Sequence, residues 1–231
     1  MTEAQSSRPA LQRLRRVLSV FVERVPRLAA NPVVCRILAR PAPLRFQESA
    51  LAHKYLDSLK GIEIGGSAHN PFGLDAINLD YTSDMNAPFK ELERQLCGDA
   101  LRVDLVATAE ALPLKDKSVD FVLSSHVIEH LADPIGALQE WQRVARKYVF
   151  IIFPHPDRTP ETLTELTTVA ELIDRNAGRR TVSADPAAHK SVWILSSFLE
   201  LMAHLKYVVV ETQDPDDKVG NGTTVVIKCE P

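Results

Sequence analysis

Apolar residues follow two different spacings along this chain. Short continuous apolar runs bounded by turn-forming residues predict buried strands, and they lie at 62–64, 76–79, 103–106, 121–123, 149–153, 207–211 and 223–228. Helical spacing occurs instead at 86–97, at about 135–145, near 162–175 and at 195–205. The last two apolar runs enclose Asp-rich and Gly-rich turns, which favour an antiparallel hairpin. This order of elements predicts an α/β fold with a seven-stranded sheet and helices on both of its faces.

The segment 119–154 is the most informative part of the pattern. An apolar run at 121–123 ends in two serines and His126, helical periodicity follows, and a second apolar run at 149–153 stops at Pro154. This order is typical of a βαβ unit, in which the two strands are parallel. Open α/β sheets bind their ligands beyond the carboxyl ends of such strands. We therefore predict a Rossmann-like, mostly parallel sheet with a C-terminal antiparallel hairpin, and a binding site near His126.

The N-terminal region differs from the rest of the chain. Residues 10–25 carry apolar side chains at helical spacing with arginines on the other faces, which predicts a basic amphipathic helix. Prolines at 32, 41 and 43 mark a boundary near residue 45. We expect a helical extension at 1–45 and a main domain at 46–231, in which 155–192 forms a polar substrate-side insertion. The basic helix could pack on the main domain, cover the substrate, or make peripheral contact with a partner or a membrane surface.

Charge divides the chain in a similar way. Residues 1–50 hold nine Arg, no Lys and three Glu, a net charge of +6, whereas the remainder holds 18 basic and 27 acidic residues, a net charge of −9, and the sum is −3. The acidic body argues against nucleic-acid binding, which needs a positive surface. The three cysteines lack metal-site spacing, so we expect reduced thiols and a cytoplasmic location. No apolar run approaches 18 residues, and no membrane span is predicted.

Two predicted strands end in residues suited to a nucleotide-like ligand. Glu-Ile-Gly-Gly-Ser at 63–67 follows the first strand, and glycines let a backbone approach a ligand closely. Asp80 closes the second strand, where a carboxylate can accept hydrogen bonds from both hydroxyls of a ribose. Only ten residues separate Gly65 from Ala76, too few for a long helix, which disfavours NAD or FAD. Alone, the glycines could equally form a structural turn.

Several motifs occur together in one order. The chain carries Glu-x-Gly-Gly at 63–66, Asp80, Ala-Glu-Ala-Leu-Pro at 109–113, Ser-Val-Asp-Phe-Val at 118–122, Ser-His-Val-Ile-Glu-His-Leu-x-Asp-Pro at 125–134 and Trp-x-Arg-Val at 141–144. In this combination, residues 60–155 resemble class I S-adenosylmethionine-dependent methyltransferases of the branch called type 11. Residues 155–193 are more softly similar to a subgroup associated with polysaccharide and glycolipid biosynthesis.

The resemblance implies S-adenosylmethionine as the cofactor. The glycine loop would hold its methionine end, Asp80 its ribose and the loop at 108–110 its adenine, with Ser125 and His126 beside the sulfonium. The cofactor-binding residues implied in this way are Glu63, Gly65, Gly66, Ser67, Asp80, Thr108, Ala109, Glu110 and Ser125. Many relatives carry Gly-x-Gly in the loop and Asp where Thr108 stands. These departures bear on the affinity for the cofactor rather than on its identity.

Methyl transfer to a hydroxyl requires removal of a proton, for which a histidine is suited. His126 is the first candidate base, because it leaves the strand end on the cofactor side. His155, at the end of the fifth strand, is the second candidate and His189 the third, and each of the three could instead be structural. We expect the acceptor to be a hydroxyl of a small molecule, saccharide or glycolipid. Asp157 and Arg158 could bind its hydroxyls or pair with each other in solvent.

A rival interpretation comes from the letters His126-x-x-Glu129-His130, which match a zinc-hydrolase signature. That chemistry requires one continuous helix, whereas His126 directly follows a strand and Pro134 interrupts soon after His130. A further alternative is a cofactor-binding module with little catalysis that acts on a partner through its basic N-terminal helix. The pattern indicates no oligomeric state. A divalent metal could still bind, with His126, His155 and Asp157 as candidate ligands.

Overall fold

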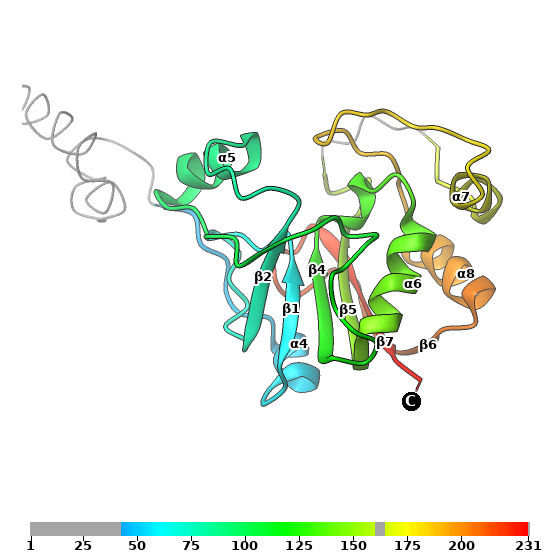
Figure 1. The fold of residues 1–231 in the computed structure, drawn as a ribbon, viewed down its shortest axis with the longest axis horizontal. Helices are drawn as coiled ribbons and strands as arrows, with labels where there is room; N and C mark the ends of the chain where they lie inside the picture. The colour runs from blue at the N-terminus through cyan, green and yellow to red at the C-terminus, as the bar shows by residue number, and fades with distance from the viewer. Residues whose placement is uncertain (1–42, 160–164, 231) are drawn as a thin grey trace, which may run out of the picture. The chain divides into compact units, whose positions relative to one another are not determined.

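The computed structural model describes residues 43–159 and 165–230 (Figure 1). The described chain forms two compact units. The smaller comprises residues 43–46, 67–71 and 84–101, and the larger comprises residues 47–66, 72–83, 102–159 and 165–230. The basic helix predicted at 10–25 lies outside the described residues, as does most of the predicted extension at 1–45. That division of the chain stays a prediction.

Seven strands form the sheet of the larger unit: β1 (Gly61–Ile64), β2 (Ala76–Asp80), β3 (Leu105–Val106), β4 (Val119–Ser125), β5 (Ala145–Pro154), β6 (Val208–Gln213) and β7 (Gly222–Lys228). Their order across the sheet is β3-β2-β1-β4-β5-β7-β6. β1 to β5 pair in parallel, whereas β7 lies antiparallel between β5 and β6. The sheet confirms the predicted Rossmann-like, mostly parallel architecture with a C-terminal antiparallel hairpin.

The described part of the larger unit also contains α4 (Ala50–Leu56), the 3₁₀ helix η2 (Ile128–His130), α6 (Pro134–Val144), α7 (Val169–Asn176) and α8 (Leu195–Leu205). α6 and α8 confirm predicted helices. α7 begins later than the sequence pattern predicts, because the Thr168 side chain accepts a hydrogen bond from the N–H of Glu171 and caps the helix there. The pattern does not predict α4, whose seven residues are too few to show clear periodicity.

Alternate residues of the central strands face two separate hydrophobic layers. Phe121 and Phe150 pack on one face with Leu56 of α4. Val122 packs on the other face, in the layer that contains the fully buried Trp141 of α6 together with residues of α8. Figure 1 shows α6 and α8 beside the sheet. The prediction of helices on both faces is therefore confirmed.

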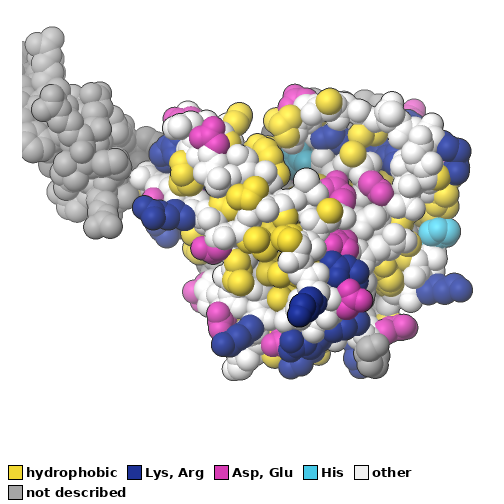
Figure 2. All heavy atoms as spheres, in the orientation of Figure 1, with side chains coloured by type: hydrophobic (Ala, Val, Ile, Leu, Met, Phe, Trp, Pro, Cys, Tyr) yellow, Lys and Arg dark blue, Asp and Glu magenta, His cyan; other side chains and the backbone are white. Residues whose placement is uncertain are grey.

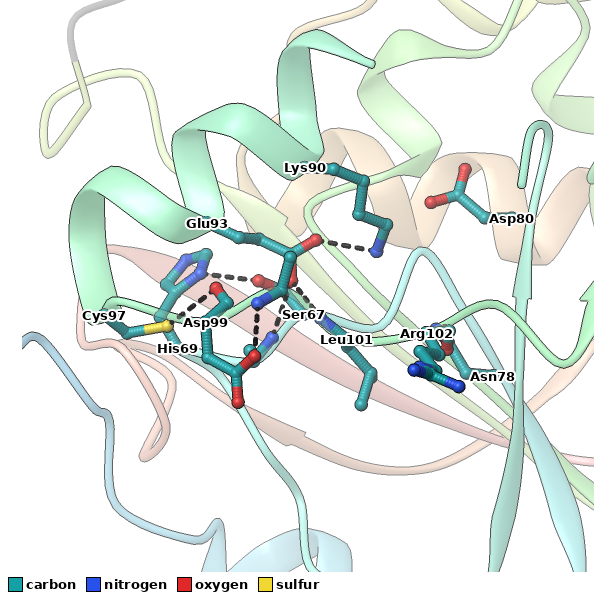
Figure 3. A network of polar contacts seen from close by, with 12 residues as sticks. Ser67, His69, Asn78, Asp80, Lys90, Glu93, Cys97, Asp99, Leu101 and Arg102 are labelled. Atoms are coloured by element: carbon teal, nitrogen blue, oxygen red, sulfur yellow. Dashed lines mark hydrogen bonds and ion pairs between the residues drawn. The ribbon is translucent and has the colours of Figure 1, made fainter. Parts of the chain in front are cut away.

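The smaller unit contains α5 (Pro88–Cys97), which the sequence pattern predicts. Glu93 on this helix is the centre of a buried polar network (Figure 3). One carboxylate oxygen accepts a hydrogen bond from Nζ of Lys90 at 2.7 Å. The other accepts from the backbone N–H groups of Ala68 at 3.0 Å and Leu101 at 2.8 Å. Glu93 therefore holds two turns of this unit to the helix.

Lys and Arg side chains gather, on the face shown in Figure 2, at the end of the larger unit where β4 and β5 begin. Two arginines next to the start of β5 have structural partners. Arg146 of β5 donates to the carbonyl oxygen of Ser118 at 2.9 Å, and Arg143 of α6 donates to that of Leu114 at 2.9 Å. These two arginines therefore hold the loop that precedes β4.

Two observations bear on the predicted location of the protein. Residues 43–159 and 165–230 include no helix with the length and apolar character needed to cross a membrane. Cys97 and Cys229 are buried free thiols. Burial raises the pKa of Cys229 to about 11, which keeps its thiol protonated and unreactive. A cytoplasmic location stays a prediction.

Candidate functional site

The chain turns sharply after β1 at Gly65 and Gly66. Gly65 has a φ of +70°, and a Cβ added there would lie 2.6 Å from the side chain of Val127. A Cβ added at Gly66 would lie 2.6 Å from Oδ1 of Asn78 and 3.0 Å from the carboxyl carbon of Glu63. Both positions therefore require glycine, Gly65 for its left-handed backbone as well as for space. The turn presents main chain rather than side chains at the carboxyl end of β1.

Asp80 ends β2 beside this turn. β1 and β2 are parallel neighbours with Ile64 opposite Leu79, so Gly65 and Asp80 follow at the same edge of the sheet. Oδ1 of Asp80 accepts a hydrogen bond from the N–H of Tyr81 at 2.7 Å, and the residue is partly exposed. The fold thus brings the glycine turn next to the carboxylate that the sequence predicts at the ribose.

Ser67, the last residue of the predicted glycine loop, belongs to the smaller unit. Its Oγ lies 2.5 Å from Nδ1 of His69 (Figure 3). Burial lowers the pKa of His69, so its ring is neutral near pH 7. Ser67 therefore has a local hydrogen-bonding partner, and its predicted role toward the cofactor stays a prediction.

Three residues of α6 hold the loop after β3. The indole N–H of Trp141 donates to the carbonyl oxygen of Ala109 at 2.9 Å. Oε1 of Glu140 accepts from the N–H of Leu112 at 2.7 Å, and Arg143 donates to the Leu112 carbonyl oxygen at 3.2 Å. Because Trp141 is fully buried, its hydrogen bond anchors this loop to the core. The Trp-x-Arg part of the sequence motif therefore positions the loop that the sequence predicts at the adenine.

Glu110 lies in this loop near the segment that precedes α8. Burial raises the pKa of its carboxyl, Asp133 raises it further, and Lys190 opposes the rise. Nζ of Lys190 donates to the carbonyl oxygens of His130 at 2.7 Å and Asp185 at 2.9 Å. The predicted substrate-side insertion therefore approaches both η2 and the predicted adenine loop.

His126 follows β4 in an unusual backbone conformation. Its φ is +55°, a left-handed value that costs a non-glycine residue about 1–2 kcal/mol and is found most often at functional sites. Its N–H donates to the carbonyl oxygen of Ile152 at 2.8 Å. On the ring, Nδ1 lies 3.1 Å from Oγ of Ser125 and Nε2 lies 3.0 Å from Oδ1 of Asn221. The fold therefore holds the first candidate base at the carboxyl end of β4 with a partner at each ring nitrogen.

Asn221 is a candidate functional residue that the sequence pattern does not reveal. It precedes β7, which the sheet order places beside β5. Besides its side-chain contact with His126, its carbonyl oxygen accepts the N–H of His155 at 3.0 Å, and Nδ1 of His155 accepts the N–H of Asp157 at 3.2 Å. Asn221 thus links the first and second candidate bases. The signal in the sequence is Gly-Asn-Gly at 220–222, which also fits an ordinary hairpin turn.

Comparison with known families decides what kind of domain carries these residues. Residues 65–153 match the family model for a methyltransferase domain of type 11, and the match runs from the glycine turn to β5. Over residues 65–153, this match supports a class I S-adenosylmethionine-dependent methyltransferase domain. The family resemblance of residues 60–155 is therefore confirmed. The softer similarity of 155–193 to the polysaccharide-associated subgroup stays a prediction.

The methyltransferase domain is also similar to solved structures. An S-adenosylmethionine-dependent methyltransferase of Thermotoga maritima is 19% identical with a TM-score of 0.45, over 76% of this chain and 84% of that chain. One of Aquifex aeolicus is 14% identical with a TM-score of 0.44, over 79% and 95%. One of Mesorhizobium loti is 13% identical with a TM-score of 0.45, over 75% and 92%. No curated protein matches the chain in the sequence comparison.

A buried carboxylate shapes the turn that carries Asn221. The two oxygens of Asp216 accept four backbone N–H groups, those of Lys218 at 3.0 Å, Val219 at 2.6 Å, Gly220 at 3.0 Å and Gly222 at 2.6 Å. Burial alone would raise the pKa of this carboxyl, but the four donors outweigh it and hold the pKa below its ordinary value. The ionised side chain of Asp216 therefore sets the position of Asn221.

The histidine motif of the domain does not lie on one continuous helix. β4 ends before His126, η2 covers Ile128–His130, and α6 begins only at Pro134. Two zinc ligands on one helical face, as a zinc hydrolase of this signature requires, are therefore not formed by His126 and His130. The structure agrees with the sequence argument against that interpretation.

His189, the third candidate base, packs against His130. Their ring centroids are 4.7 Å apart at an interplanar angle of 79°. Burial lowers the pKa of His130 to about 4, so this imidazole is neutral at pH 7. Within the described residues, the group of metal-type ligands that the fold brings together is Glu129, His130 and His189. This group differs from the predicted metal ligands His126, His155 and Asp157.

Proposed function

We propose that this protein transfers a methyl group from S-adenosylmethionine to a hydroxyl of a small molecule, saccharide or glycolipid. The observation that carries the proposal is the contact between His126 and Asn221 at the carboxyl end of β4, inside a methyltransferase domain. The choice of a saccharide or glycolipid is supported by the similarity of residues 155–193 to the polysaccharide-associated subgroup.

The residues at the carboxyl ends of β1 and β2 fit this cofactor. Gly65 and Gly66 leave main chain without side chains where the methionine end would bind. The carboxylate of Asp80, at the same edge, suits the two ribose hydroxyls. The loop of Ala109 and Glu110, anchored by α6, would bind the adenine. When bound, S-adenosylmethionine supplies a methyl group from a positively charged sulfur, and the sulfur keeps the electron pair of the carbon–sulfur bond that breaks.

His126 would accept the proton of the acceptor hydroxyl. A hydroxyl becomes a good nucleophile only as its proton is removed, and a positioned base contributes about 10²–10⁴-fold to the rate. Oδ1 of Asn221 can only accept, so the nitrogen that it contacts, Nε2 of His126, carries the hydrogen. Nδ1 then keeps a lone pair on the side of Ser125. Nδ1 would accept the proton of the acceptor hydroxyl as that oxygen takes the methyl group.

In this mechanism Asn221 is a positioning residue. It selects the tautomer of His126 and, through its main-chain bond to His155, fixes the end of β5 beside it. Asp216 supports this arrangement, because its four hydrogen bonds define the turn that carries Asn221. Under this proposal, His155 and Asp157 would contact the acceptor rather than remove its proton.

The test is the variant His126→Ala. We expect its calorimetric affinity for S-adenosylhomocysteine to stay close to that of the unchanged protein, and its turnover to fall by about 10²–10⁴-fold. Turnover is measured as S-adenosylhomocysteine release with a panel of saccharide and phenol acceptors. His204→Ala, which changes an exposed histidine of α8, is the matched control. Full turnover by His126→Ala would refute the assignment of the base.

The engagement of both ring nitrogens of His126 favours one alternative, a cofactor-binding module with little catalysis. A base that never exchanges its Ser125 contact for an acceptor hydroxyl would remove no proton. That alternative predicts S-adenosylhomocysteine binding by calorimetry without methyl transfer to any hydroxyl acceptor. Transfer to one acceptor, abolished in His126→Ala, excludes it.

A further inference from the structure

Glu129, His130 and His189 form a cluster that the methyl-transfer mechanism does not use. Each residue offers one ligand atom, and these atoms all lie within 4.8 Å of one another. The Glu129 side chain is 1% exposed and that of His130 is 18% exposed. Two of the residues come from η2, whereas His189 comes from the segment before α8. The cluster therefore lies where the predicted substrate-side insertion meets the methyltransferase domain.

The ring of His130 is oriented as a metal ligand would be. Its Nδ1 lies 3.2 Å from the carbonyl oxygen of Ala188, which can only accept, so Nδ1 carries the hydrogen. Nε2 is then the unprotonated ring nitrogen, and it lies 3.7 Å from Oε1 of Glu129. A ring N–H held by a main-chain carbonyl is the usual support of a metal-binding histidine, because it fixes the tautomer and the direction of the other nitrogen.

The spacing of the donor atoms suits a small ion. Four ligands at 2.0–2.2 Å around a tetrahedral zinc lie about 3.4 Å from one another. The observed 3.7 Å between His130 and Glu129 is close to this value, and the ligand atoms of the whole group lie within 4.8 Å of one another. Two imidazole nitrogens and one carboxylate oxygen are a zinc donor set, whereas Mg²⁺ and Ca²⁺ prefer oxygen ligands.

The backbone around the cluster is already fixed in place. The carbonyl oxygen of Glu129 accepts the N–H groups of Lys190 at 2.7 Å and Ser191 at 3.1 Å. Nζ of Lys190 donates to the carbonyl oxygen of His130 at 2.7 Å and to that of Asp185. The two segments that supply the ligands are therefore hydrogen-bonded to each other, and little ordering would remain to be done when an ion binds.

We propose that Glu129, His130 and His189 bind one Zn²⁺ ion, which fastens the segment around residue 189 to η2. Three protein ligands leave a fourth position for water or for an oxygen of the substrate. This site differs from the zinc-hydrolase signature, because Nε2 of His126 contacts Asn221 and His189 takes the place of that histidine. The proposal does not depend on the identity of the methyl acceptor.

The experiment uses the full chain without a histidine tag, stripped with a chelator and dialysed. Zinc titration by calorimetry and metal analysis by mass spectrometry are expected to show about one tightly bound Zn²⁺ per chain, and Mg²⁺ should not compete. His189→Ala is expected to weaken binding by at least about tenfold. His189 is partly exposed, so this variant should fold, and circular dichroism checks that it does. His204→Ala is the matched control and should bind zinc as the unchanged protein does.

Three results would overturn the proposal. The first is no saturable zinc binding by the unchanged protein. The second is equal affinity in His189→Ala and His204→Ala, which would place the zinc elsewhere. The third is an unchanged melting temperature when zinc is added, because an ion that joins two segments of the folded chain must stabilise it. A rise in melting temperature that is present in His204→Ala and absent in His189→Ala supports the site.

Discussion

Replacing Asp216 by alanine would leave four backbone N–H groups without their acceptor. The hydrogen bonds from Lys218 and Gly222 are buried, and each buried donor left unsatisfied costs about 1–3 kcal/mol. The donors of Val219 and Gly220 are only partly buried and can turn to water. We therefore expect Asp216→Ala to lower the free energy of unfolding by about 2–6 kcal/mol. That is a large share of the roughly 5–15 kcal/mol typical of a folded domain.

Urea unfolding followed by tryptophan fluorescence measures this loss, because the two tryptophans of the chain, Trp141 and Trp193, are both buried. Asp216→Asn keeps one accepting oxygen, so it should cost about half as much and remain measurable if the alanine variant does not fold. Asp99→Asn is the control, since Asp99 is exposed and its side chain can still accept the N–H of Ala100. A folded Asp216→Ala within about 0.5 kcal/mol of the unchanged protein refutes the reasoning.

The same carboxylate predicts how stability depends on pH. Burial raises the pKa of Asp216, but its N–H donors lower it by more, so the folded state favours the ionised form. The stabilisation is complete above the unfolded-state pKa of about 3.9 and is lost as the pH falls through the lower folded-state pKa. The difference in unfolding free energy between the protein and Asp216→Asn should therefore stay constant from about pH 8 to about pH 5 and shrink below about pH 4. A difference that grows on acidification contradicts this assignment.

Two further predictions concern the methyl-transfer site. Asn221→Ala should lower turnover by about 10–100-fold with little change in affinity for S-adenosylhomocysteine. Asn221→Asp can still accept a hydrogen bond from Nε2 of His126, so it should keep most of the turnover. Equal turnover in the two variants contradicts a positioning role. Gly66→Ala places a Cβ 2.6 Å from Oδ1 of Asn78, so calorimetric affinity for S-adenosylhomocysteine should fall by at least about tenfold, whereas Gly178→Ala, with nothing within 4 Å of its added Cβ, should keep it.

The strands can be predicted because central parallel strands need apolar residues on both faces. Phe150 and Ile151 are both fully buried and belong to opposite layers, so a continuous apolar run is what their strand requires. α4 cannot be predicted, because its apolar pattern is too short. Its three buried residues, Leu51, Ala52 and Leu56, span less than two turns, which is too short for a helical period to stand out.

The parts of the site that depend on neighbouring residues can also be predicted. Gly65 and Asp80 are each defined by the end of their own strand, and both lie where the sequence pattern places them. Asn221 cannot be found in this way, because its contact with His126 joins residues 95 positions apart. Only the place of β7 between β5 and β6 brings them together. The group of Glu129, His130 and His189 cannot be predicted for a similar reason, since His189 lies in a segment without strand or helix.

The position of β7 also bears on the order in which the protein is made. Ribosomes release a chain from its N-terminus, and early parts can begin to fold before later parts exist. β1, β2 and β4 emerge well before Asn221, which follows His126 by 95 positions. A nascent chain can therefore form the glycine turn and present Asp80 while His126 still lacks its partner. Under the proposed mechanism, the residues that would hold the methyl donor are therefore synthesised before the partner of the base.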